Sequence, residues 1–257
     1  MSLIEDLPYG LPPWHMAGRA LAVWLRLANP DAFRRRLPAI IDVPDDPVVR
    51  LRLWDLAHDA GYGQTATLTH PEMTAFREVA LAAPASYGGL AGDFTKYIYA
   101  DDPTYTAFGR EVMGWPVRHG KIMVGRPWPG TPLAEEQQFT GYLERNGSRL
   151  VSVVLTLRAP LARSEYPTGL PMWLSAKSIP DPGGAALAVN QLVRSGPSAI
   201  RWGEIWKATA TVAFESSATD DLNFLQPFTV VAAQYWADLD LTIGPGKVLA
   251  EIPNPLR

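Results

Sequence analysis

The chain has no cysteine and few lysines. Without cysteine among its 257 residues, disulfides, thiolate catalysis, iron–sulfur clusters and cysteine-ligated zinc are excluded. Only five of the 23 basic residues are lysines, and the others are arginines, which stay charged and cannot act as amine nucleophiles near neutral pH. Any amine chemistry therefore depends on the five lysines, which are Lys96, Lys121, Lys177, Lys207 and Lys247.

Long apolar runs and dense positive charge are also missing. No apolar run approaches the ~20 residues that a membrane span needs. The first eight residues carry acidic groups where a signal peptide would carry basic ones. The formal net charge is −3, and the one dense basic run, Arg34–Arg36, is short. We therefore expect a cytoplasmic protein that has neither a membrane nor a nucleic acid as its partner.

Common cofactor motifs are absent as well. The four histidines show no HExxH or other close metal-ligand spacing. The sequence contains no GxGxxG or GxxxxGK[ST] after a strand, and no GxSxG elbow. His58 and Asp59 are adjacent, so on a strand they would point to opposite faces, and a strand-end turn is the favoured interpretation. We expect no metal and no cofactor.

The pattern of turns predicts the fold class. The 24 prolines and 21 glycines divide the whole length into short segments, which is typical of antiparallel sheets joined by turns. We expect one α+β domain over residues 1–257, mainly antiparallel β with a few peripheral helices. Helices are predicted from Pro30 and over 71–82. Strands are predicted over 21–27, 48–56, 94–99, 105–112, 121–124, 138–145, 150–158, 171–179, 185–193 and within 200–214, while 224–238 is either strand or helix.

Two local patterns are specific. Asn146–Gly147 between two apolar segments predicts a hairpin. Residues 48–56 alternate, which places Leu53 and Asp55 on one face of a strand and Arg52 and Trp54 on the other.

The segment from Gly109 to Lys121 is dense in functional residue types. Composition alone favours a structural ion pair between Arg110 and Glu111 and a packed turn at Trp115–Pro116. However, Gly-Arg-Glu followed four residues later by aromatic-Pro resembles the signature of the acetoacetate decarboxylase superfamily. The stretch from Gly92–Asp93–Phe94 to this motif also resembles the family, and the resemblance extends more weakly over nearly the full length.

The resemblance implies an acetoacetate decarboxylase-like β-barrel or sandwich that forms a homo-oligomer. In true decarboxylases of this family two lysines follow the aromatic-Pro pair. The first forms a Schiff base with the substrate ketone, and the second lowers the pKa of the first. Val117 and Arg118 stand at these positions here. Valine forms no imine, whereas Arg118 keeps the second positive charge and can hold a ligand oxygen.

The family also places charged groups around its lysine. One carboxylate aligns with Leu53 or, after a one-residue shift, with Arg52. Asp55 shares the face of Leu53, so it either supplies a displaced carboxylate or bonds to backbone at the strand end. The second family carboxylate aligns near Thr67, inside an apparent insertion. Arg19 aligns with a family arginine that can hold a carboxylate or enolate oxygen.

These residues lead to one principal hypothesis. We expect a lysine-independent lyase for a small oxo acid or a polyketide-like or aromatic-derived carbonyl compound, catalysing hydration, dehydration, carbon–carbon cleavage or cyclisation. Its predicted catalytic residues are Arg118, Glu111, Asp55 and His119, and its predicted substrate-binding residues are Arg19, Trp115, Val117 and Lys96.

Two alternatives remain open. One keeps Schiff-base decarboxylase or aldolase-dehydratase chemistry on a relocated lysine, Lys96 or Lys121. The other is a barrel that binds a small molecule without catalysis.

Overall fold

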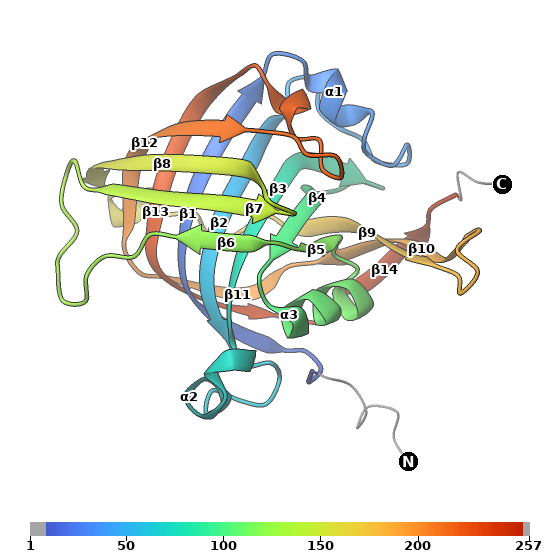
Figure 1. The fold of residues 1–257 in the computed structure, drawn as a ribbon, viewed down its shortest axis with the longest axis horizontal. Helices are drawn as coiled ribbons and strands as arrows, with labels where there is room; N and C mark the ends of the chain where they lie inside the picture. Colours follow the sequence, from blue (N-terminus) through green and yellow to red (C-terminus); the bar gives the residue numbers. More distant parts are fainter. Residues whose placement is uncertain (1–8, 254–257) are drawn as a thin grey trace.

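A large, mostly antiparallel sheet forms the body of the protein in the computed structural model, which describes residues 9–253 (Figure 1). Twelve strands follow one another in the order β14-β10-β9-β4-β3-β2-β1-β13-β12-β8-β7-β6, with β5 paired to β4 and β11 paired to β13. The strands are β1 (Trp14–Leu27), β2 (Val48–His58), β3 (Ala75–Tyr87), β4 (Leu90–Ala100), β5 (Val117–His119), β6 (Lys121–Val124), β7 (Gln138–Arg145), β8 (Ser148–Pro160), β9 (Trp173–Pro180), β10 (Leu187–Ser195), β11 (Pro197–Trp202), β12 (Ile205–Phe214), β13 (Phe228–Ile243) and β14 (Lys247–Glu251).

Short helices lie at the edges of this sheet. They are α1 (Pro30–Arg34), α2 (Ala66–Thr69), α3 (Pro103–Phe108) and a π-helical turn over Gly109–Met113. None of the helices described within residues 9–253 is long and apolar enough to cross a membrane.

The sheet bends so that both faces of β1–β4 are covered. One face shares an apolar core with β6–β8, which lie across it (Figure 1). The other face packs against α3, the segment around Trp115 and the second half of β13. Strand β2 lies between β1 and β3, and its residues enter these two cores alternately. Leu51 and Leu53 belong to the first core, whereas Trp54 and Leu56 belong to the second. The alternation expected for this strand is confirmed.

Most of the expected elements are confirmed. Strands β6 and β7 have the expected bounds, and β7 and β8 form the hairpin at Asn146–Gly147. Asn29 caps α1 by accepting a hydrogen bond from the backbone N–H of Ala32 at 3.3 Å. The 224–238 segment is strand, within β13. The mainly antiparallel fold class is confirmed, although the strand order is an open path rather than a closed barrel in the described part of the chain.

Two expected elements are wrong. The helix over 71–82 is instead a 3-10 turn, Pro71–Met73, followed by β3, because Ala75–Ala82 pairs with β2 and Glu78–Tyr87 pairs with β4. The strand over 105–112 is instead α3 and the π-helical turn. The side chain of Asp102 accepts from the backbone N–H of Tyr105 at 2.5 Å, and Pro103 occupies the first turn, so this helix has both common start signals.

Candidate active site

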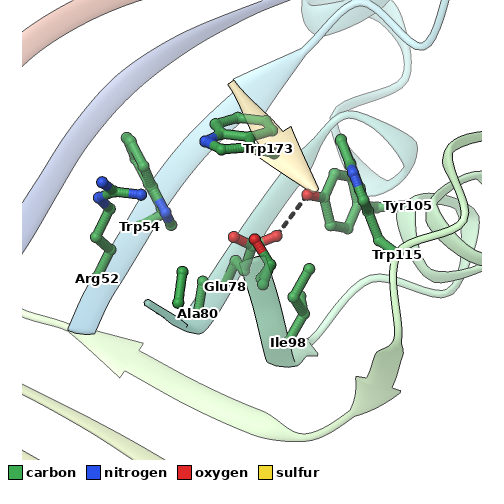
Figure 2. Close-up of a pocket in the computed structure, with 10 residues that line it drawn as sticks. Arg52, Trp54, Glu78, Ala80, Ile98, Tyr105, Trp115 and Trp173 are labelled. Carbon is green, nitrogen blue, oxygen red and sulfur yellow. Dashed lines mark hydrogen bonds between the residues drawn. The ribbon is translucent and has the colours of Figure 1, made fainter. Parts of the chain in front are cut away.

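A small cavity opens on the α3 side of strands β2, β3 and β4. Its volume is about 20 Å³, which is room for one water molecule. Figure 2 shows its lining, which combines one arginine, one glutamate and one tyrosine with mainly aromatic and aliphatic walls. The lining residues are Arg52, Trp54, Glu78, Ala80, Ala82, Thr95, Ile98, Tyr105, Trp115 and Trp173.

The strand register brings the charged side chains to the same face. Arg52 and Trp54 are two residues apart on β2 and therefore point the same way. Trp54 lies opposite Glu78 on β3, and Arg52 lies opposite Ala80. Arg52 is thus a diagonal neighbour of Glu78, at a spacing that long side chains can bridge.

Glu78 is a buried carboxyl group, 7% exposed. The Tyr105 hydroxyl donates a hydrogen bond to Glu78 Oε2 at 2.5 Å (Figure 2). Burial raises the pKa of Glu78 to about 7, against the opposing effects of the Tyr105 hydrogen bond and the positive charge of Arg52. Near neutral pH this group therefore exists in both its protonated and its ionised form, as a proton carrier must.

Arg52 is buried to a similar degree and holds the positive charge of the cavity. Its Nη2 lies 3.4 Å from Asp93 Oδ2, and Arg50 pairs with the same carboxylate. Burial lowers the pKa of Arg52 to about 9, and the charge of Arg50 adds to this effect, so Arg52 still carries its charge at neutral pH. Its Nε has no hydrogen-bond partner among the described residues. A buried donor without a partner is costly, and a substrate oxygen would satisfy it.

Trp115 is held firmly in the wall of the cavity. Gly114 ends the π-helical turn with a φ of +72°, which a glycine adopts readily. The backbone N–H of Trp115 then donates to the carbonyl of Gly109 at 2.7 Å, and its indole N–H donates to Ser195 Oγ at 2.8 Å. Trp173 packs edge-to-face on Trp115, with ring centroids 5.7 Å apart. These indoles shield Glu78 from bulk water, which strengthens its electrostatic interactions.

No lysine lines this cavity in residues 9–253. Val117, at the position where the family resemblance implies a Schiff-base lysine, is 1% exposed and pairs with Ile98 of the cavity wall. Lys96 lines a neighbouring cleft rather than the cavity. Lys121 is exposed, and its Nζ pairs with Glu144 at 3.2 Å.

Asp55 and Arg19 lie together, away from the cavity. Because Asp55 is one residue from Trp54, it points toward the opposite face of β2. Arg126 binds its carboxylate through two nitrogens, each at 2.6 Å. Arg19 lies 3.5 Å from it and Arg77 lies 3.9 Å from it.

The other residues expected from the sequence are dispersed. Glu111 accepts a hydrogen bond from the Tyr9 hydroxyl at 2.5 Å, and His119 is exposed. Arg118 donates to Asp220 at 2.6 Å and lines the same cleft as Lys96. Trp115 is the member of the expected set that lines the cavity.

Sequence reasoning missed Glu78 and Tyr105 as site residues. Because the helix predicted over 71–82 and the strand predicted over 105–112 are wrong, the sequence does not bring Glu78 of β3 and Tyr105 of α3 together. The signal in the sequence that helps to locate the site is the alternation of β2, which places Arg52 and Asp55 on opposite faces of the strand. In the described residues no group of three or more histidine, aspartate or glutamate side chains is arranged to hold a metal ion.

Comparison with known proteins places the chain in a family. A family model described as acetoacetate decarboxylase (ADC) matches residues 7–252. Acetoacetate decarboxylase 3 from Mesorhizobium japonicum is 26% identical over 227 residues, which covers 84% of this chain and 78% of the relative. Acetoacetate decarboxylase from Paraburkholderia xenovorans is 25% identical over 254 residues, covering 96% and 90%.

Solved structures share the fold. An acetoacetate decarboxylase-like enzyme from Sphingomonas wittichii superposes with a TM-score of 0.84 at 22% identity, covering 93% of each chain. The enduracididine biosynthesis enzyme MppR, complexed with pyruvate, superposes with a TM-score of 0.78 at 22% identity, covering 97% of this chain and 95% of MppR. At such identities the superpositions establish the fold, and the match over residues 7–252 establishes the family: the chain belongs to the acetoacetate decarboxylase family.

Proposed function

We propose that this chain is a lysine-independent lyase that enolises a small oxo acid, with Glu78 as the proton carrier and Arg52 as the oxygen-binding group. One observation carries the proposal. A buried carboxyl group with a pKa near 7 shares an apolar cavity with a charged guanidinium that has an unpartnered donor, and no lysine lines that cavity in the described residues. Glu78 takes the role expected for Asp55, Glu111 or His119, and Arg52 takes the role expected for Arg19.

The geometry supports a two-step proton transfer. Arg52 donates a hydrogen bond to the substrate carbonyl oxygen, and ionised Glu78 removes a proton from the adjacent carbon. The negative charge that develops on the oxygen is stabilised by the guanidinium, which is already oriented by Asp93. Protonated Glu78 then returns the proton to carbon or donates it to a leaving hydroxyl group, which completes a dehydration.

Tyr105 acts on Glu78 rather than on the substrate. Its hydroxyl fixes one carboxylate oxygen and leaves the other free for the proton. A three-carbon acid is larger than the single water that the cavity admits, so parts of the wall other than Trp115 have to move on binding.

Proton exchange tests this proposal directly. The chain is incubated with pyruvate in D₂O, and deuterium incorporation at the methyl group is followed by NMR. Pyruvate is a suitable probe because it is the ligand named for the MppR complex, which has the same fold. We expect exchange above the buffer rate, and a loss of about 100-fold or more in Glu78→Gln. The exposed Glu72→Gln is the matched control. Equal exchange in wild type and Glu78→Gln refutes the proposal.

A second candidate function uses the amine of Lys96. Burial, together with the nearby charges of Arg118 and Arg36, lowers the pKa of Lys96, which favours the free amine. Borohydride reduction in the presence of acetoacetate, followed by peptide mass mapping, separates the candidates. An adduct on Lys96 supports Schiff-base chemistry, whereas unmodified lysines together with active exchange support Glu78. Binding of pyruvate without exchange or adduct supports a non-catalytic protein.

We also propose that the chain acts in the cytoplasm as a homo-oligomer without a cofactor. Membership of the family supports the oligomer as an expectation. Light scattering coupled to gel filtration measures the mass, with 28.2 kDa as the value for a monomer.

A further inference from the structure

A second hollow lies beside the cavity and has a different character. Its volume is about 220 Å³, and it shares Thr95 and Trp115 with the cavity. Four cationic side chains line it, and no acidic residue of the described chain does. We call it the cationic cleft, lined by Phe94, Thr95, Lys96, Arg110, Trp115, Pro116, Arg118, Ala176, Lys177 and Ser178.

The positive charge of the cationic cleft is only partly balanced. Arg118 pairs with the carboxylate of Asp220 at 2.6 Å. Lys177 Nζ donates to the carbonyl of Glu111 at 2.5 Å, and Arg110 donates to the carbonyl of Val117 at 3.3 Å, so both cations are bonded to neutral oxygens. Three of the four positive charges therefore lack a carboxylate partner in the described structure.

Lys96 has the fewest polar partners of the four cationic side chains. The structure gives it no hydrogen bond and no ion pair within residues 9–253. It is half-buried, and its pKa is lowered by burial and by the charges of Arg118 and Arg36. An anion in the cationic cleft would give the buried Lys96 amine a polar partner and would balance the charges of the neighbouring guanidiniums. It would therefore offset both causes of the lowered pKa of Lys96.

We propose that the cationic cleft binds a second anionic group, a carboxylate or a phosphate, of the same substrate whose carbonyl end occupies the Glu78 cavity. The inference rests on the proposed function for the placement of the carbonyl end. The shared Thr95 and Trp115 make the two sites direct neighbours. The substrate class is then an oxo acid with a negative charge at each end, rather than a monoanion such as acetoacetate.

Calorimetry with 2-oxoglutarate and pyruvate tests the proposal. We expect 2-oxoglutarate, which has two carboxylates, to bind about tenfold or more tightly than pyruvate, since charge-assisted hydrogen bonds are the strong ones. Lys96→Met removes a charge without leaving a partner unpaired and should weaken 2-oxoglutarate binding about fivefold to tenfold, a larger loss than for pyruvate. Lys96→Arg keeps the charge and should bind 2-oxoglutarate within about twofold of wild type. Lys247→Met, at an exposed lysine outside the cleft, is the matched control.

The outcomes are distinct. Equal affinity for 2-oxoglutarate and pyruvate, or Lys96→Met binding 2-oxoglutarate like wild type, overturns the proposal. Loss of binding in Lys96→Arg as well as Lys96→Met also overturns it, because that pattern requires an amine rather than a charge. Competition by succinate or by inorganic phosphate then identifies the anion. Binding is repeated in Glu78→Gln: retained discrimination with unaltered proton exchange means that the proposed function fails while the anion site stands.

Discussion

Two buried carboxyl groups lie on neighbouring strands of the same sheet and point to opposite faces. Asp55 is 5% exposed and Glu78 is 7% exposed, so burial does not distinguish them. The two groups differ in the side chains that contact them. Asp55 is contacted by three guanidiniums, one of which binds both of its oxygens. Glu78 accepts a hydrogen bond from one tyrosine hydroxyl and shares a cavity lined by indoles with one guanidinium, that of Arg52.

The partners of Asp55 suit a structural ion pair, whereas those of Glu78 suit a proton carrier. The guanidiniums around Asp55 occupy its carboxylate oxygens and leave them few free lone pairs. A carboxyl group in an apolar cavity has its pKa raised toward neutrality and keeps one oxygen free.

Removing a guanidinium should slow pyruvate exchange on the Glu78 face of the sheet and not on the Asp55 face. Arg52→Gln removes the charge that stabilises the developing enolate oxygen, so we expect pyruvate exchange to fall about 1000-fold. Arg126→Gln removes a guanidinium from Asp55 on the opposite face and should leave exchange within about threefold of wild type. NMR-detected exchange measures both, and similar losses in the two variants would abolish the distinction between the faces.

Removing the Asp55 charge should reduce stability rather than exchange. Asp55→Asn leaves Arg19 and Arg126 without a carboxylate partner among the described residues, whereas Arg77 keeps Asp101. We expect the free energy of unfolding to fall by about 2 kcal/mol. Urea denaturation measures this value. Exchange per folded molecule should stay within about threefold of wild type. A collapse of exchange in a fully folded Asp55→Asn protein would return the catalytic role to Asp55.

The buried Glu78 should make the free energy of unfolding depend on pH. Because the pKa of Glu78 is raised from 4.5 to about 7, the folded state binds more protons than the unfolded state between these values. The contribution of Glu78 to stability is therefore full below pH 4.5 and falls as pH rises to about 7, by about 3 kcal/mol. Glu78→Gln lacks this loss, so its advantage over wild type should grow across the same range. Parallel stability curves for the two proteins from pH 4.5 to 7 would show that Glu78 titrates normally.

Tyr105 should give the smallest effect. Its hydrogen bond lowers the pKa of Glu78, so Tyr105→Phe should raise that pKa by roughly one pH unit. Exchange at pH 7 should fall about fivefold and recover at higher pH, because more of Glu78 is then ionised. The pH profile of exchange provides the readout, and a loss that is equal at every pH would assign Tyr105 a merely structural role.

The sequence predicts the fold well where local signals agree with the tertiary context. The Asn146–Gly147 hairpin and the alternation of β2 depend on a few adjacent residues, and both are confirmed. Strand β3 is different, because both of its faces are buried and its residues lack polar alternation. Only its pairing with β2 and β4 decides its conformation, and this pairing is not local.

The candidate site was harder to predict than the fold. The resemblance directs attention to Trp115, which lines the cavity, and to Val117 at the position where the resemblance implies a lysine. The position of Glu78 depends on the register between β2 and β3, and that of Tyr105 depends on a helix that begins at Asp102–Pro103. Arg52 and Asp55 were separable from the alternation alone, but their partners come from distant segments that the sequence does not connect.

Direct titration of the Glu78 carboxyl group tests the central claim. Difference infrared spectroscopy of wild type against Glu78→Gln, recorded from pH 3 to 9, isolates the protonated carbonyl band of this one side chain. The account predicts that the band disappears with a midpoint near pH 7, as expected for a buried proton carrier. A midpoint near the ordinary value of 4.5 would contradict it, because Glu78 would then be a plain carboxylate at neutral pH.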